Sequence, residues 1–410
     1  MSNRAPRGYR FNPFYFLFIL YFVSNAIALV MVACGMPIAV EMREFQFDET
    51  IIAASALALF SSLFAALAAY RLGLAIETPR HIMTFGRMAA LTLMLVQLSY
   101  FLYSTYYGVN IAGVEDDIVE NSNLKLVFSV IQPDQLFLIF AVGIRSNRLF
   151  WINAIIYVIS LTLRGWMGGL YLLALVVAIR NAPLVVTRKG FVITGLLLSV
   201  GIIILPMIVS AKWFIRSGAG VSEAMDFLSE FGYLNYLIDS VSYVVNRFQH
   251  LGHVAMLAQD SQKLSTAYEL GEFTPYWMDG APQWLFLRLN GIDIFQFQRF
   301  IASHYFDANN LAYAVNPGIA GWFFVLQVKV VFFLFFLLAV TLPPTLLILR
   351  FAGHRYFLLA SCMVLVYLFH GWIGAYVNFV LYLIAFMLAQ RLLFGRSSVR
   401  QVGAEVRLSS

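Results

Sequence analysis

The chain has 410 residues, of which 61% are hydrophobic and only 12% charged, with a formal net charge of +6. Apolar runs of about 20 residues, the length that crosses a bilayer as a helix, recur along the whole sequence. This composition excludes an ordinary soluble enzyme and predicts an all-α protein, a polytopic transmembrane helical bundle. Both cysteines, Cys34 and Cys362, lie in apolar runs, which argues against a disulfide framework or a cysteine-based zinc site.

Ten apolar runs are predicted as membrane spans, within a range of nine to twelve. They cover residues 14–40, 51–70, 88–108, 124–143, 149–163, 165–180, 191–210, 320–349, 356–372 and 375–394. The first run follows a basic N-terminal segment, as a signal peptide core does. It is longer than the roughly 7–15 residues of such a core, and many spans follow it, so it predicts a retained helix.

Basic residues are concentrated in alternate connections between these runs. With the N-terminus in the cytoplasm, the inner connections carry 17 of the 27 Lys and Arg, whereas the short outer loops 41–49 and 115–120 are acidic. Cytoplasmic loops are enriched in Lys and Arg, so both termini are predicted inside a bacterial inner membrane. The predicted domains are an N-terminal bundle (1–210), a large periplasmic loop (211–319), three C-terminal helices (320–395) and a cytoplasmic tail (396–410).

The connection 211–319 is too long to be a simple turn and is neither low in complexity nor charged enough for disorder. Helical periodicity runs over 220–258, and 273–282, rich in Pro, Gly and aromatic residues, predicts an ordered loop. We expect a small cap on the outer face of the bundle. Its aromatic residues are candidates for stacking on sugar rings, although interfacial Tyr and Trp are common in membrane proteins; they include Tyr233, Tyr236, Tyr276, Trp277 and Trp284.

One arginine, Arg164, interrupts about thirty otherwise apolar residues and is followed by Gly165 and Gly169. A charge at this depth is costly, so the side chain either reaches the outer headgroups or faces a wet cavity with an anionic partner. The glycine pair lets a second helix or a lipid approach the backbone closely. Because guanidinium offers two parallel donors to phosphate, an anion clamp is the sharper hypothesis.

A second polar group lies in the loop. At spacings of three and four residues, Tyr243, Asn246, Arg247, His250 and His253 are predicted to form one stripe of a helix that faces water or a polar ligand. The pair His250 and His253 suggests a metal site, but no convincing third ligand is nearby, so we expect no metal and no other cofactor. A plain solvated helix face is the alternative interpretation.

A third group precedes the eighth span and consists of Arg288, Arg299, His304, Asp307, Asn309 and Asn310. Several arginines on one face suit a diphosphate, but a guanidinium keeps its proton and cannot act as a base. The residues eligible as a base are His250, His253, His304, Glu230, Asp239, Asp279 and Asp307.

Two segments resemble the O-antigen polymerases and ligases. Leu161-Thr162-Leu163-Arg164-Gly165, running into Gly169, resembles their Thr-x-Ser-Arg-Gly span. Asn309-Asn310-Leu-Ala-Tyr followed by Pro317-Gly318-Ile-Ala-Gly321 resembles their His-Asn-x-x-Leu and Gly-x-x-Gly segment, which re-enters the membrane after the large periplasmic loop. The order of features extends the resemblance over nearly the whole chain.

The resemblance implies an inner-membrane glycosyltransferase that acts on undecaprenyl-diphosphate-linked glycans, with membrane lipids and a chain-length regulator as further partners and no nucleic acid. It matches Arg164 and Arg247 to essential arginines and Asn310 to the family asparagine. With His250, these are the predicted catalytic residues; the predicted substrate-binding residues are Tyr243, His253, Arg288, Arg299, His304 and Asn309.

Two positions depart from the family pattern. Asn309 stands where ligases have histidine, and Leu163 replaces the usual serine. The first difference favours a polymerase over the ligase that transfers glycan to lipid A-core. A glycosyltransferase that uses a polyprenyl monophosphate sugar has only the acidic run 115–117 in its favour. A lipid-linked glycan flippase would show an internal repeat, which this chain lacks.

Overall fold

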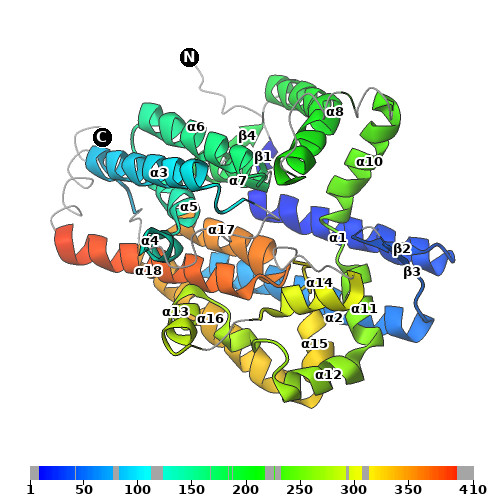
Figure 1. Ribbon diagram of the computed structural model, residues 1–410. Helices are drawn as coiled ribbons and strands as arrows, with labels where there is room; N and C mark the ends of the chain where they lie inside the picture. The colour runs from blue at the N-terminus through cyan, green and yellow to red at the C-terminus, as the bar shows by residue number, and fades with distance from the viewer. Residues whose placement is uncertain are drawn as a thin grey trace.

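The structure, a computed structural model, describes residues 9–41, 43–76, 83–111, 123–166, 168–182, 184–186, 188–217, 226, 232–291, 295–306 and 314–394. Most of these residues lie in α-helices (Figure 1). The strands among them are three residues each and form two antiparallel pairs, β1 (Tyr9–Phe11) with β4 (Leu184–Val186) and β2 (Ile38–Val40) with β3 (Arg43–Phe45). The all-α class is confirmed.

Six helical segments in the described part of the chain are long and apolar enough to cross a membrane. They are α1 (Pro13–Ala33), α2 (Glu49–Ala75), α3 (Arg87–Tyr107), α8 (Arg188–Ser217), α15 (Gly321–Leu326) continued through a 3₁₀ turn into α16 (Val330–Phe351), and α18 (Ile373–Phe394). Shorter apolar helices are α4 (Asn123–Ile131) with α5 (Pro133–Gly143), α6 (Asn147–Leu163), α7 (Gly168–Arg180) and α17 (His354–Met363). These long apolar helices support a membrane protein, and the number of spans stays a prediction.

Three predicted spans differ in detail. The span predicted over 14–40 ends as a helix at Ala33, where Gly35 adopts a positive φ of 79° and the chain turns into β2. The span predicted over 124–143 is broken at Gln132, because the proline that begins α5 disfavours helical geometry in the residue before it. In the span predicted over 356–372, α17 passes into a π-helical turn at Val364–Leu368.

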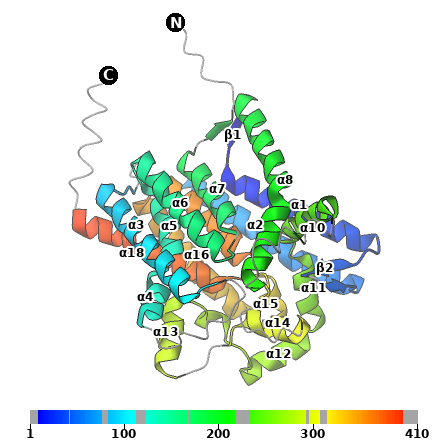
Figure 2. The same cartoon turned by 45° about the horizontal axis from the view of Figure 1, so that its top comes forward.

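Contacts bring the predicted inner connections together. The β1–β4 pair joins two of them and lies beside the start of α8 (Figure 2). Phe85 forms a β-bridge with Ile144, and Arg180 donates a hydrogen bond to the Asn147 side chain at 2.8 Å. Predicted outer segments also meet: Trp166 donates to the Asn110 carbonyl at 3.3 Å. The structure therefore groups the connections as the charge pattern does, and the compartment that each group faces stays a prediction.

The long loop contains α10 (Tyr233–Asn246), α11 (Leu251–Gln259), α12 (Ser261–Leu270), a 3₁₀ turn (Tyr276–Met278), α13 (Ala281–Leu289) and α14 (Phe297–Phe306). The ordered loop expected over 273–282 is thus a short 3₁₀ turn between helices. α10 packs against α8, and α11 packs against α2 and α15 (Figure 1). Every residue from Leu251 to Leu257 is buried, and the apolar ones belong to the same core cluster as α1 and α2. One loop helix is therefore part of the bundle core.

Candidate functional site

The polar stripe from Tyr243 to His253 is not one helix, as was expected. α10 ends at Asn246, Arg247 is its C-cap, and α11 begins after His250, its N-cap. The backbone N–H groups of Arg247 and Phe248 bond carbonyls three residues back, which tightens the last turn and bends the chain. The five stripe residues nevertheless line one cavity of about 510 Å³, so their predicted convergence stands although the helical geometry was wrong.

We call this space the histidine cavity. Its wall also includes Glu41, Asp239, Gln249 and Asn316. Glu41 comes from the turn between β2 and β3 and has a φ of 53°, which is unusual for a residue with a side chain. Strained backbone of this kind is concentrated at functional sites. Asn316 comes from the segment that returns from the loop to the bundle.

Two cations share the Tyr243 hydroxyl, and one of them, Arg247, lines the histidine cavity. Arg247 donates from Nη2 to the Tyr243 hydroxyl at 2.8 Å, and the Lys212 ammonium donates to the same hydroxyl. Burial alone would raise the pKa of Tyr243, but the charges and hydrogen bonds of Arg247 and Lys212 outweigh it, so the pKa of this phenol is lowered. The Arg247 side chain is 39% exposed and lies 3.8 Å from a Glu41 oxygen. Its guanidinium can therefore reach both Glu41 and a ligand in the cavity.

Two histidines also line this cavity, His250 and His253. His253 Nε2 lies 3.6 Å from Glu41 Oε1. The His250 ring centroid lies 4.3 Å from that of His370, whose Nε2 contacts the Tyr21 hydroxyl at 2.5 Å. Burial lowers the pKa of His250, and the nearby His370, His253 and Arg247 lower it further. His250 is therefore neutral at physiological pH.

Buried polar atoms in this wall lack partners. Within the described residues, neither ring nitrogen of His250 or His253 and neither side-chain polar atom of Gln249 has a hydrogen bond. A buried polar group without a partner costs about 1–3 kcal/mol. A ligand with hydroxyl or phosphate oxygens would satisfy these atoms. No group of three His, Cys, Asp or Glu among the described residues is placed to hold a metal ion.

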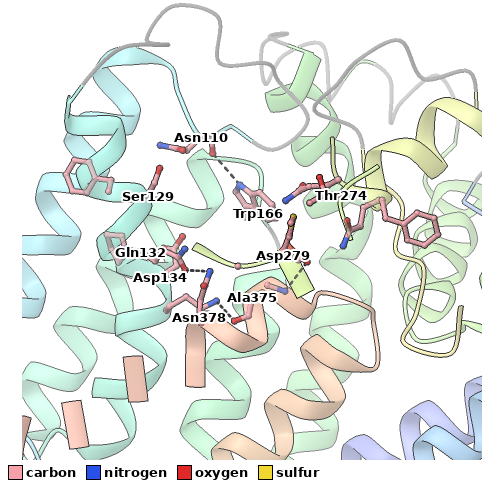
Figure 3. A pocket seen from close by; sticks show the side chains of 18 of the residues that line it. Asn110, Ser129, Gln132, Asp134, Trp166, Thr274, Asp279, Ala375 and Asn378 are labelled. Carbon is pink, nitrogen blue, oxygen red and sulfur yellow. Dashed lines mark hydrogen bonds between the residues drawn. The ribbon is translucent and has the colours of Figure 1, made fainter. Parts of the chain in front are cut away.

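Arg164 does not join Arg247 in the histidine cavity. It is the C-cap of α6 and is buried, and its Nη2 donates to both carboxylate oxygens of Asp134 at 2.9 Å. It also donates to the Tyr100 hydroxyl and to the Ser160 carbonyl, each at 3.1 Å. The anionic partner that the sequence required is thus Asp134, in the first turn of α5. Asp134 lines a second cavity, shown in Figure 3.

The remaining predicted residues are elsewhere. Arg299 and His304 lie on α14 and line neither cavity, and the His304 ring stacks on Phe300 with centroids 5.6 Å apart. Asn309, Asn310 and the eligible bases Glu230 and Asp307 lie outside the described residues. Arg288 belongs to α13, but its side chain is outside the described part of the structure. Of the other eligible bases, Asp239 lines the histidine cavity and Asp279 lines the second cavity.

Sequence reasoning missed several groups. Glu41 was counted only as part of an acidic outer loop, and Lys212, Gln249, His370 and Asp134 were not singled out. A carboxylate directly after a helix-starting proline, thirty residues from a lone membrane arginine, is a signal that could have suggested Asp134. For the other four, no local sequence pattern marks the pairing.

Comparison of the chain with protein-family models, with curated proteins and with solved structures gives no match. The fold itself defines the class: an all-α protein with several helices suited to a membrane and a polar cavity between its loop and its bundle.

Proposed function

We propose that the protein is a bacterial inner-membrane glycosyltransferase that polymerises undecaprenyl-diphosphate-linked oligosaccharide repeat units on the periplasmic side. One observation carries the proposal: the histidine cavity is lined by a guanidinium, that of Arg247, and by a carboxylate–imidazole pair, Glu41 with His253. The resemblance of the Arg164 and Asn310 segments to O-antigen polymerases supports the same function.

The chemistry needs two things that this cavity offers. The acceptor sugar hydroxyl attacks the anomeric carbon of the donor glycan, a new C–O bond forms, and the bond from that carbon to the diphosphate oxygen breaks. Undecaprenyl diphosphate leaves with the electron pair, and Arg247 stabilises the developing negative charge, an effect that is large where water is excluded. The hydroxyl proton passes to His253, whose Nε2 lies 3.6 Å from the Glu41 carboxylate.

His250 is assigned a different role from His253. Its lowered pKa keeps it neutral, so it is suited to hydrogen-bond a sugar hydroxyl or a phosphate oxygen rather than to accept the transferred proton. Tyr243 holds the Arg247 guanidinium by a hydrogen bond and a ring contact of 4.9 Å, which fixes the direction of the cation.

The first experiment is a deletion of the gene in its native host with inspection of the lipopolysaccharide. Core plus a single repeat unit is the expected product. Bare core would instead identify a ligase or a flippase and would refute the polymerase function.

The second experiment replaces Arg247. Arg247→Ala should abolish polymer while the protein still inserts into the membrane. Arg247→Lys should make only part of the wild-type amount of polymer, because lysine keeps the charge but lacks the two parallel N–H donors of guanidinium. Lys263→Ala, a cation on the same loop that is 74% exposed and pairs with Asp260, is the matched control and should leave polymer unchanged. Normal polymer in Arg247→Ala at normal expression would rule out this residue as the diphosphate ligand.

The third experiment separates the proton acceptor from the cation. His253→Gln and Glu41→Gln should each reduce turnover by about 10²-fold or more, the contribution of general base catalysis, with the smaller loss for Glu41→Gln. Both should change the pH dependence of the rate, which a purely structural role would leave unaltered. Variants that keep the wild-type pH profile would exclude His253 as the base.

A further inference from the structure

A second cavity of about 520 Å³ lies at the predicted outer end of the bundle, away from the residues that line the histidine cavity. We call it the amide cavity, because four glutamines and two asparagines line it. Figure 3 shows Asp134, Trp166, Asp279 and Asn378 around this space. The amides are Gln132, Gln135, Gln296, Gln298, Asn110 and Asn378.

The amide cavity offers no guanidinium to a diphosphate among its described lining residues. Two carboxylates, Asp134 and Asp279, line it, and Lys125 is the one cation among its described lining residues. Arg164, the nearest candidate clamp, already donates two hydrogen bonds to Asp134 and does not reach the cavity wall. A doubly charged phosphate group there would face carboxylates rather than guanidinium.

The same lining suits a neutral oligosaccharide. Carboxylate and amide groups accept and donate hydrogen bonds in pairs, which matches neighbouring sugar hydroxyls. Trp166 beside them is 48% exposed and offers a flat apolar face to the C–H side of a sugar ring. Of the loop aromatics that were expected to stack on sugars and whose side chains the structure describes, Tyr276 lines this cavity.

Unpartnered buried groups give independent support. The Trp322 side chain is only 2% exposed, and its indole N–H has no hydrogen-bond partner among the described residues. The Gln135 side-chain oxygen also lacks one. Buried polar groups normally have partners, so their presence at a cavity wall points to a polar ligand rather than to a lipid chain. A lipid chain would leave the Trp322 indole N–H and the Gln135 oxygen without a partner.

One carboxylate is held in place by the fold. Asp279 Oδ2 accepts from the Gly374 backbone N–H at 3.0 Å, at the start of α18, where the positive end of the helix dipole favours an anion. A side chain at Gly374 would have its Cβ 2.5 Å from Asp279 Oδ1, so only glycine allows this approach. The loop residue Asp279 is thereby positioned against the bundle at the cavity wall.

We propose that the amide cavity binds the uncharged glycan of the substrate, while the histidine cavity binds the diphosphate and the reacting hydroxyl. The long loop contributes to both: α10 and α11 to the histidine cavity, and Thr274, Tyr276, residues 278–280 and residues 296–298 to the amide cavity. The assignment of this glycan to a lipid-linked substrate rests on the proposed function. The binding of a neutral oligosaccharide by the amide cavity does not rest on it.

The test measures binding by titration calorimetry with the full-length protein in lipid nanodiscs. The first probe is the oligosaccharide that mild acid releases from the lipid-linked repeat units of the host, which carries no phosphate. The second probe is inorganic pyrophosphate. The variants are Trp166→Ala and Asn378→Ala, neither of which contacts Arg164 in the structure. Trp277→Ala is the matched control, since Trp277 is 46% exposed, close to the 48% of Trp166, but lines neither cavity.

We expect Trp166→Ala and Asn378→Ala to weaken oligosaccharide binding by about tenfold or more, the usual consequence of losing a major packing or hydrogen-bond contact. Trp277→Ala and Arg247→Ala should bind the oligosaccharide as the wild type does, and pyrophosphate should be affected by Arg247→Ala alone. No oligosaccharide binding by the wild type, or unchanged binding in both variants, would overturn the assignment.

The two proposals fail separately. If Trp166→Ala loses the oligosaccharide while deletion of the gene gives bare core, the amide cavity stands and the proposed function falls. If Arg247→Ala loses polymer while both amide-cavity variants bind the oligosaccharide as the wild type does, the proposed function stands and the assignment of the amide cavity falls. Size-exclusion profiles and circular dichroism of each variant confirm that a loss of binding is not a loss of fold.

Discussion

Replacing Asp134 by alanine should destabilise the protein strongly. Arg164 is 6% exposed at its side chain and makes four hydrogen bonds, two of them to Asp134. In Asp134→Ala the guanidinium keeps only two neutral acceptors, the Tyr100 hydroxyl and the Ser160 carbonyl. Removing one partner of a buried ion pair costs about 3–5 kcal/mol. Because Asp134 itself is 36% exposed, water replaces part of the lost interaction, and we expect the free energy of unfolding to fall by about 3 kcal/mol.

A series of variants isolates this effect. Asp134→Asn keeps one acceptor oxygen and should cost less, about 1–2 kcal/mol. The double variant Arg164→Met with Asp134→Leu removes both charges and should recover most of the loss, because no charge is left buried alone. Glu269→Ala is the matched control: its pair with Lys329 is more than half exposed on both sides, so its loss should cost under about 1 kcal/mol.

The assay is equilibrium unfolding of the purified protein in mixed micelles with increasing dodecyl sulfate, followed by tryptophan fluorescence. A cost below about 1 kcal/mol for Asp134→Ala, or a double variant as unstable as the single one, would refute the reasoning. It would mean that Arg164 reaches water or headgroups on its own, which is the alternative interpretation of the sequence.

Three further predictions follow from the same structure. In Gly374→Ala the new Cβ would lie 2.5 Å from Asp279 Oδ1, so the same unfolding assay should show a cost of about 1–3 kcal/mol. Gly168→Ala is the control and should show no cost, because no atom lies within 4 Å of its Cβ position. Equal unfolding free energies for the two variants would contradict the packing at Gly374. Because burial lowers the pKa of His250, the unfolded chain binds a proton that the folded chain does not once the pH falls below about 6.5. Stability should be full above that pH and decline below it by up to about 1.4 kcal/mol per pH unit, with a shallower decline in His250→Gln. Purified enzyme should retain full activity on lipid-linked repeat units in EDTA; activity lost in chelator and restored by Mg²⁺ or Mn²⁺ would show that a metal carries the charge assigned to Arg247.

Hydropathy along the sequence was enough to locate the helices. A helix of apolar side chains forms wherever about 20 such residues follow one another, so each predicted span overlaps an apolar helix. Local breaks were less predictable. The end of α1 at Ala33 and the bend at residues 247–250 depend on backbone turns that periodicity does not report, since a stripe of polar residues can continue across a bend.

The sequence by itself also determined which polar residues need partners. A lone arginine among apolar residues must be neutralised, and the loop residues Tyr243, Arg247, His250 and His253 had to share a polar surface. It did not determine the partners. Glu41 meets His253, and Asp134 meets Arg164, only because helices distant in sequence pack side by side. Tertiary packing therefore decided that the two arginines belong to different sites, because an ion pair depends on distances of a few ångströms across the core, which no local pattern encodes.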